Sequence, residues 1–217
     1  MFVWAKFVCY PCVGAYLGLL MQLTRGIAAL ATASMLCGCA FIGSAPPATY
    51  DLQAPSIEKS RGTNAVQIMV SPPVAVKTID TEEILVKGPN GRVAYFSGTA
   101  WGDRLPRLFQ ARLAEALANS GAFRAVLTNQ DRVAGDYSLA IEIRDFQVET
   151  TPAGAEAVVD VYVKLVNEHN SAVVTTKRFQ THELAASQDP GAGIQALNGA
   201  FQQVVREIVS WVSRRSA

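Results

Sequence analysis

The hydrophobic positions after residue 60 follow two periods, and these predict a mixture of strands and helices. Alternation of apolar and polar residues over 66–70, 137–148 and 155–166 is typical of half-buried strands, and the more polar segment 172–184 is interpreted as another strand. The first of these strands ends at Ser71-Pro72-Pro73, because proline has no N–H to donate to a neighbouring strand. The pattern therefore predicts one early strand and three long strands late in the chain.

Two local signals refine this set of strands. The short apolar segments 84–86 and 92–96 flank Pro89-Asn90-Gly91, whose turn-forming residues predict a β-hairpin. In the strand over 137–148 the apolar residues change face near Arg144-Asp145, which predicts a β-bulge there.

Two other segments repeat their apolar residues at the spacing of an α-helix. Asp103 is the predicted N-cap of the first helix, Pro106 fits its first turn, and Gly121 fits the C′ position beyond its end. The second helix opens at Asp189-Pro190, a favoured N-cap and N1 pair. The predicted buried faces are Leu105, Leu108, Phe109, Leu113, Ala116 and Leu117 in the first helix, and Ile194, Leu197, Phe201, Val204, Val205, Ile208 and Val212 in the second.

The order of these elements predicts an α+β fold. Strands, a helix, more strands with short connections and a final helix describe an antiparallel β-sheet with two main α-helices packed on one face. We expect this domain to span 50–217. The preceding segment 40–49 is small, proline-containing and uncharged, and it is interpreted as a flexible tether.

Composition supports a folded body and argues against nucleic acid as the main partner. Half of the 217 residues are hydrophobic and 17% are charged, which suits a packed core. Lys6 and Arg25 are the only charged residues up to Gly38, so the rest of the chain holds 17 basic and 18 acidic residues, a net charge of about −1. No basic run occurs in it that could neutralise a phosphate backbone.

The residues that could carry catalytic or metal chemistry are sparse. His169 and His182 lack a cysteine or carboxylate at ligand spacing, so a solvated strand face is favoured over a metal site. The SxxK string at 56–59 occurs without the partner motifs of penicillin-recognising enzymes. No phosphate-binding loop, nucleophile elbow or zinc-protease motif occurs in the sequence. The prediction is a protein that is not an enzyme and uses no cofactor or metal.

Two tryptophans beside the predicted helices each have two interpretations. Trp101 precedes the first helix, and Trp211 lies near the end of the second. Each can pack in the core, as a hydrophobic staple does. Each can otherwise lie on the surface and anchor a partner or a lipid, so both are candidate partner-binding residues.

The segment 21–38 has the pattern of a targeting signal. Arg25 gives it a short positive region, and the apolar run over 26–36 is too short for a membrane-spanning helix of about 20 residues. Leu36-Cys37-Gly38-Cys39 resembles the lipobox of bacterial lipoproteins. The resemblance implies cleavage before Cys39, a lipid on its thiol and an acyl chain on its new amino terminus. Three acyl chains would hold the protein to a membrane far more firmly than one chain.

Lipidation of Cys39 sets the boundaries that we expect at the front of the chain. Cys37 fits the lipobox less well, because Ser34 then stands where a leucine belongs. The signal peptide is then 21–38, and 39–49 hold the lipidated cysteine and the tether. The alternative is a secretory signal with two incidental cysteines. No cysteine follows Cys39, as suits a periplasmic protein without a disulfide framework.

Residues 1–20 do not suit this signal, because they place a second apolar run ahead of Arg25. They are interpreted as a mis-assigned or dispensable extension, with Met21 as the true start. The alternative is a membrane span over 7–36 that Arg25 interrupts. The string Cys9-Tyr10-Pro11-Cys12 resembles a redox CxxC motif, but no thioredoxin-like unit surrounds it, so it is interpreted as incidental.

Several short motifs of the body occur together in order. YDLQAP begins at Tyr50, VSPP begins at Val70, and the longest block, WGDRLP and the helix after it, begins at Trp101. With these motifs, 50–213 resembles the ABC-type transport auxiliary lipoprotein family, which includes PqiC/YmbA-like outer-membrane lipoproteins. One departure is Gly102, where members of the family often carry alanine.

The resemblance implies a non-catalytic component of an ABC system that moves lipids or other hydrophobic compounds across the cell envelope. Such systems pair an ATPase and a permease with a membrane-anchored MCE-domain protein that crosses the periplasm, so these are the implied partners. The lipid anchor adds the membrane, and a homo-oligomer is a further option.

The expected location is the outer membrane, facing the periplasm. Ala40 stands after the lipid-bearing cysteine, where an aspartate would favour the inner membrane in enteric bacteria. Two rival functions stay open at this point. A lipid carrier needs a sizeable apolar cavity between sheet and helices, and a structural lipoprotein would support outer-membrane assembly.

Overall fold

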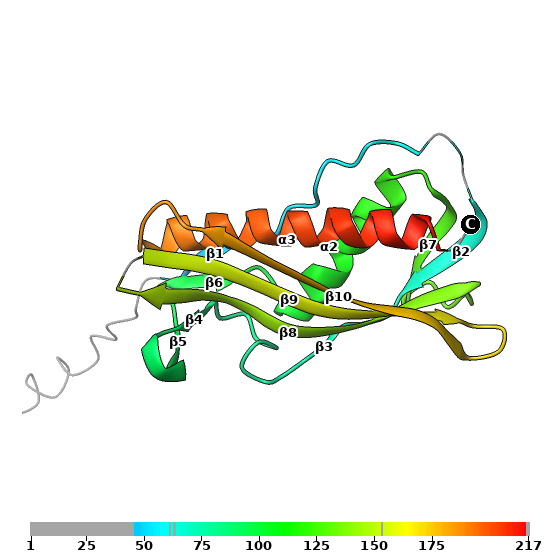
Figure 1. Cartoon of the computed structure of the whole chain (residues 1–217). Helices are drawn as coiled ribbons and strands as arrows, with labels where there is room; N and C mark the ends of the chain where they lie inside the picture. The colour runs from blue at the N-terminus through cyan, green and yellow to red at the C-terminus, as the bar shows by residue number, and fades with distance from the viewer. Residues whose placement is uncertain (1–45, 61, 63, 153, 216–217) are drawn as a thin grey trace, which may run out of the picture. The chain divides into compact units, whose positions relative to one another are not determined.

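The computed structural model describes residues 46–60, 62, 64–152 and 154–215 (Figure 1). The predicted signal peptide, Cys39 and most of the tether therefore lie outside the described residues. The strands are β1 (Ala48–Tyr50), β2 (Asn64–Val70), β3 (Val74–Ala75), β4 (Leu85–Lys87), β5 (Val93–Tyr95), β6 (Thr99–Trp101), β7 (Phe123–Thr128), β8 (Tyr137–Thr151), β9 (Gly154–Asn167) and β10 (Ala172–Leu184). The helices are the short 3-10 helix η1 (Pro89–Gly91), α2 (Leu105–Asn119) and α3 (Pro190–Ser213).

The main sheet combines antiparallel and parallel pairs. β9 lies between β8 and β10 and pairs antiparallel with both. The other edge of β8 is covered in turn by β2, β3 and β4, which all run parallel to it, and β7 pairs parallel with β2. The sheet is therefore mixed rather than wholly antiparallel, a correction to the prediction. For the β2–β7 pair the cause is the long crossover through α2, which returns the chain to β7 in the direction of β2.

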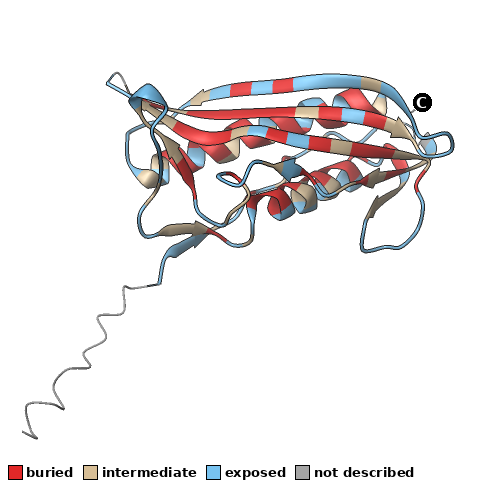
Figure 2. Ribbon diagram, turned by 90° about the horizontal axis from the view of Figure 1, so that it is seen from below, coloured by how far each residue is buried: buried red, intermediate tan, exposed pale blue. Residues whose placement is uncertain are grey.

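Both main helices cover the same face of this sheet, as Figures 1 and 2 show. Alternate residues of β9 from Val159 to Leu165 are fully buried on this side. Phe201 of α3 meets Phe109 of α2 edge-on, with ring centroids 5.2 Å apart, and lies 6.3 Å from the ring of Phe146 in β8. Side chains thus fill the space between the layers, and the predicted α+β fold with two helices on one face is confirmed.

Local turn chemistry explains the irregular points of the strands. β4 and β5 form the predicted antiparallel hairpin. Asn90 and Gly91 in its turn have φ of 62° and 74°, the left-handed region that these two residue types tolerate best. The predicted bulge in β8 is confirmed as a register shift between Ile143 and Asp145.

The helix ends follow the capping rules with one change. Gly121 has φ of 62° just beyond α2, as predicted for the C′ position. Asp189 is the N-cap of α3, with Pro190 in the first turn. At α2, however, the N-cap is Arg104 and not Asp103. The Asp103 carboxylate accepts the Arg104 N–H at 2.7 Å, so the helix begins one residue later than predicted.

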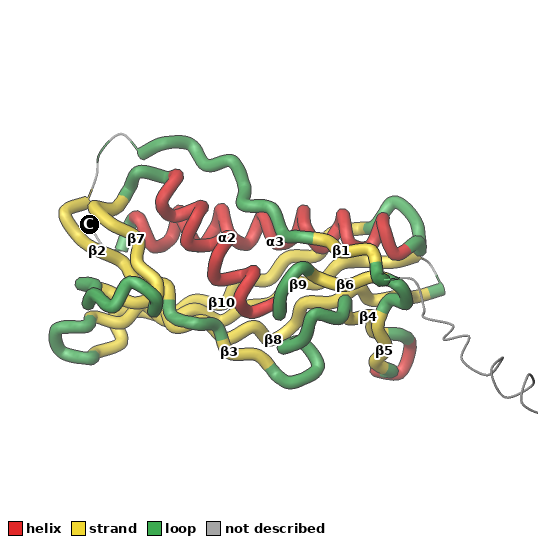
Figure 3. Tube along the Cα trace, turned by 180° about the vertical axis from the view of Figure 1, so that it is seen from behind, coloured by secondary structure: helices red, strands yellow, loops and turns green. Residues whose placement is uncertain are grey.

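A second, two-stranded sheet joins the N-terminal segment to the domain. β1 pairs parallel with β6, from Ala48 opposite Thr99 to Tyr50 opposite Trp101. Residues 51–60, which we term the strap, then run in extended form over the helices on the side away from the main sheet (Figure 3). The two helices thus lie between the sheet and the strap.

Gly199, in the interior of α3, gives a stability prediction. We expect Gly199→Ala to raise the free energy of unfolding by about 0.5–1 kcal/mol, because alanine favours the helix and restricts the unfolded chain. The three atoms nearest to the added Cβ all belong to the Glu183 carboxylate, the far end of a flexible side chain. Thermal unfolding should show Tm raised by about 1–4 °C.

Gly193 supplies the matched control in the same helix. A Cβ there would lie 3.0 Å from Cγ2 of Val148 and 3.3 Å from Cζ of Phe96, both held by packing. Gly193→Ala should therefore bring no gain in Tm, or a loss. Equal gains for both substitutions would contradict this account of the two positions.

Candidate functional site

Arg112 of α2 fastens the first half of the strap. Its Nε donates a hydrogen bond to the Leu52 carbonyl at 2.7 Å, and its guanidinium forms ion pairs with Asp51 and with Glu115. The hydrogen bond to the Asp51 carboxylate is the main cause that raises the pKa of Arg112. Leu52 itself is buried. One side chain thus joins the strap to the outer surface of the helices.

Two further contacts continue this attachment along the strap. The Gln53 N–H donates to the side-chain oxygen of Asn198 in α3 at 2.9 Å. The Ser60 N–H donates to the carbonyl of Ser120, just beyond α2, at 2.8 Å. The strap is therefore bonded to both helices and not only laid over them.

Arg112→Met tests the attachment. Methionine keeps an apolar stem but removes the donors to Leu52 and Asp51, and we expect a loss of about 1.5 kcal/mol in the stability of the strap. Amide hydrogen exchange over 51–55 should accelerate by about tenfold. Arg107→Met is the control, because Arg107 is an exposed α2 residue whose side chain pairs with Asp103, at 3.4 Å, and not with the strap. Unchanged protection in Arg112→Met would mean that burial of the strap alone holds it.

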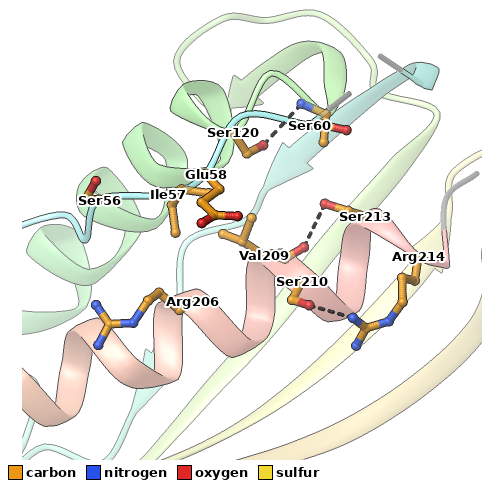
Figure 4. A pocket seen from close by; sticks show the side chains of 11 residues that line it. Ser56, Ile57, Glu58, Ser60, Ser120, Arg206, Val209, Ser210, Ser213 and Arg214 are labelled. Atoms are coloured by element: carbon orange, nitrogen blue, oxygen red, sulfur yellow. Dashed lines mark hydrogen bonds between the residues drawn. The ribbon is translucent and has the colours of Figure 1, made fainter. Parts of the chain in front are cut away.

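A groove of about 530 Å³ lies between the second half of the strap and the C-terminal half of α3 (Figure 4). Ile57 and Glu58 of the strap point toward α3. Val209 adds a second apolar side chain, and Arg206 of α3 adds a basic one. Neither histidine of the chain is among its lining residues. The groove can hold an apolar group beside charged ones, but it offers no imidazole to activate its serines Ser56, Ser60, Ser120, Ser210 and Ser213.

The two histidines lie towards opposite ends of β10 and are not brought together. His169 lies in the turn between β9 and β10, with Nε2 3.9 Å from Oδ1 of Asp136. His182 lies near the far end of β10, with Nδ1 3.5 Å from Oε2 of Glu156. Among the described residues no group of three or more potential ligands occurs. Ser56 lies in the extended strap and not at a helix N-terminus, so the SxxK string has no catalytic geometry.

Both candidate tryptophans lie in the core. Trp101 is 3% exposed and packs edge-on against Phe146, with centroids 6.1 Å apart. Trp211 is 5% exposed and packs edge-on against Phe179 at 5.7 Å. The core interpretation is confirmed for both. Neither side chain has the exposed area that a surface anchor for a partner or lipid needs.

The open face of the sheet carries an ion pair between a buried aspartate and an exposed arginine, which sequence analysis missed. Asp160 of β9 is 1% exposed, and both of its carboxylate oxygens accept hydrogen bonds of 2.6–3.1 Å from Arg178 of β10. These hydrogen bonds are the main cause that raises the pKa of Arg178. Because Arg178 holds the whole carboxylate, the pair serves structure and not acid–base chemistry. Polar residues at alternate positions of both predicted strands were the only signal for it.

The interior leaves little room for a transported molecule. Fully buried side chains from both helices and from β8 and β9 fill the described interface between sheet and helices. The largest of them are aromatic and aliphatic residues such as Phe109, Phe146, Phe201 and Leu113. The cavity that a lipid carrier requires is therefore occupied by the protein itself. Within the described residues, neither helix has the length and hydrophobicity to cross a bilayer.

Comparison with known proteins gives one family match and several structural relatives. The model of a family described as the ABC-type transport auxiliary lipoprotein component matches residues 50–209. An uncharacterized protein of Bradyrhizobium diazoefficiens, bll6063, is 29% identical over 164 residues, which are 75% of this chain and 44% of that protein. The chain thus spans less than half the length of this curated relative.

Two solved structures share the fold. Protein XCC0632 of Xanthomonas campestris superposes with a TM-score of 0.71 at 24% identity, over 77% of this chain and 95% of the other. The hypothetical protein CT253 of Chlamydia trachomatis has a TM-score of 0.50 at 13% identity, over 70% and 98%. These likenesses establish the arrangement of sheet and helices.

Proposed function

Because the chain belongs to the ABC-type transport auxiliary lipoprotein family, we propose that it is a non-catalytic part of an MCE-type ABC system that moves lipids or other hydrophobic compounds across the cell envelope. The observation that carries the proposal is the extent of the family match, which covers 50–209 and so nearly the whole described domain. The partners are an MCE-domain protein that spans the periplasm and its permease and ATPase.

The anchor is proposed to be a lipidated Cys39 in the outer membrane, with the domain facing the periplasm. The lipobox and Ala40 support this location. The chain between Cys39 and Pro46 reaches at most about 25 Å when fully extended. A domain on so short a tether stays beside its membrane, so a transport partner from the opposite membrane has to extend to it.

A docking role fits the described domain better than a carrier role does. Its interior is filled, whereas its strap, groove and sheet edges offer surfaces to another protein. In the described part of the chain, neither the groove residues nor the histidines form a catalytic arrangement. Both points support an auxiliary component that binds and positions other subunits.

A pull-down tests this proposal. The protein carries a C-terminal tag on a long flexible linker, because Arg214 near the C-terminus lines the groove. Membranes are extracted in mild detergent, and co-purifying proteins and lipids are identified by mass spectrometry. Cys39→Ala is the control for the anchor. Ile57→Arg, which places a charge in the groove, shows whether partners bind there.

Recovery of an MCE-domain protein with its ABC subunits, reduced in Cys39→Ala, is the expected result. Bound lipid without these proteins would move the assignment to a carrier. Assembly factors or cell-wall components in their place would support a structural lipoprotein. If the pull-down recovers none of them, the proposed transport role fails.

A further inference from the structure

β10 presents a long free edge. In the described part of the chain it has one neighbour, β9, although it is 13 residues long. The unpaired N–H and C=O groups of such an edge form a template for another strand. Large exposed apolar side chains lie at both ends of it: Val173 and Val174 are 53% and 48% exposed at its start, and Leu184 is 80% exposed at its end.

Two opposite charges lie symmetrically on this edge strand. Lys177 pairs with Val163 and Glu183 with Ala157, and both of these β9 residues are fully buried under the helices. Lys177 and Glu183 therefore share the helix-side face of β10. They stand at equal distances before and after Gln180. Neither has an ion-pair partner among the described residues, and the Lys177 ammonium lies over the Phe179 ring, 4.6 Å from its centroid.

We propose that β10 of a second copy of this chain pairs antiparallel with this edge, with Gln180 opposite Gln180. In this register Lys177 of each copy lies opposite Glu183 of the other, on the same face, so one contact forms two ion pairs. The pairing has two-fold symmetry and closes on itself, as most homodimer contacts do. It also satisfies the open backbone groups of both edges.

The ends of the strands fit this register as well. The exposed Leu184 of one copy lies opposite Thr176 of the other, two residues along the chain from Val174. The apolar end of one strand thus lies near the apolar start of its neighbour, so these exposed side chains lose part of their contact with water. No charge of the same sign is opposed on the helix-side face.

The flank of α3 beneath the edge has room for a side chain from an added strand. A recess of about 210 Å³ lies there, between Glu183 and the small residues Ala192 and Ala196 of α3. Gly199 extends this flank, and the Glu183 carboxylate lies over it. The Lys177 side chain of the second copy would enter beside small residues and meet a carboxylate.

A simpler account is that these charges guard the edge against any pairing, since inward-pointing charges do this in many sheets. Guarding explains each charge alone, but it does not require two charges of opposite sign on the same face of the strand. A charge exchange separates the two accounts, because guarding charges can be reversed without effect.

The first experiment is sedimentation velocity on the full-length protein in mild detergent, across a range of concentrations. Lys177→Glu and Glu183→Lys should each weaken dimerisation by at least about tenfold, because each opposes like charges twice. The double exchange Lys177→Glu with Glu183→Lys should restore the dimer. A monomer at every concentration, or a dimer that none of the three variants alters, would overturn the proposal.

The second experiment is cross-linking, which the lack of cysteine beyond Cys39 makes specific. Gln180→Cys should form a disulfide-linked dimer on mild oxidation, because the Cβ atoms of directly opposed residues lie close enough for a small strand movement to bring them to the separation of about 3.5–4.5 Å that a disulfide spans. Thr176→Cys alone should not, but it should cross-link to Leu184→Cys when the two proteins are mixed. Equal cross-linking of Thr176→Cys alone and Gln180→Cys would overturn the register. Neither experiment needs a transport partner, so the outcome is independent of the proposed function.

Discussion

Phe201→Ala is expected to lower the free energy of unfolding by about 3–5 kcal/mol, the cost of emptying a large buried aromatic site. Phe201 is fully buried, and its ring contacts those of Phe109 and Phe146 from the other helix and from the sheet. Its loss removes contacts with both the neighbouring helix and the sheet at one point. At about 2–4 °C per kcal/mol, thermal unfolding should show Tm lower by about 6–20 °C.

Val76→Ala is the control for this measurement, because Val76 is 60% exposed. It should change the free energy of unfolding by less than about 0.5 kcal/mol. A loss below about 1 kcal/mol for Phe201→Ala would show that the interior between sheet and helices is loosely filled. That result would restore the lipid-carrier alternative.

Cys39→Ala is expected to abolish lipidation completely. Without the thiol no lipid can be attached, and the precursor should keep its signal peptide and fail to reach the outer-membrane fraction. Metabolic labelling with palmitate and intact-mass measurement would detect both effects. The Cys39→Ala protein should carry no label, and it should be heavier than the mature wild-type protein because it keeps the signal peptide.

Cys37→Ala is the matched control two residues away, and it should keep both the label and the mature mass. Label that survives Cys39→Ala but disappears in Cys37→Ala would move the anchor to Cys37. A wild-type chain that takes up no label would support the secretory signal with incidental cysteines.

The local features of the fold could be predicted from sequence because each depends on neighbouring residues. The helical spacing of apolar residues predicted α2 and α3, the turn residues at 89–91 predicted the β4–β5 hairpin, and the change of face near Asp145 predicted the bulge. Each signal lies within a few residues of the feature that it predicts. The exception is the N-cap of α2, where a hydrogen bond between adjacent residues moved the start by one position.

Pairings between distant segments could not be predicted in the same way. β7 was missed, and β2 lies between β7 and β8 as their parallel neighbour, an arrangement that depends on how α2 crosses the sheet. The contact of Arg112 with Leu52 joins residues 60 positions apart. Trp101 was ambiguous for the same reason, since only the packed sheet decides whether its side chain is covered. The Asp160–Arg178 pair also required knowledge of which strands are neighbours.

The parallel pairing of β1 with β6 has a mechanical consequence. A force applied to the segment before Ala48 would act along β1. It would therefore load the hydrogen bonds between β1 and β6 in shear. Two bonds beside this pair are those from the Ala48 N–H to the Gly98 carbonyl and from the Gly102 N–H to the Tyr50 carbonyl. The next two residues of the chain, Asp51 and Leu52, are held by Arg112 through an ion pair and a hydrogen bond. With the anchor proposed at Cys39, tension from the membrane would load these two attachments before it reached β2, so the main sheet would keep its shape under the load.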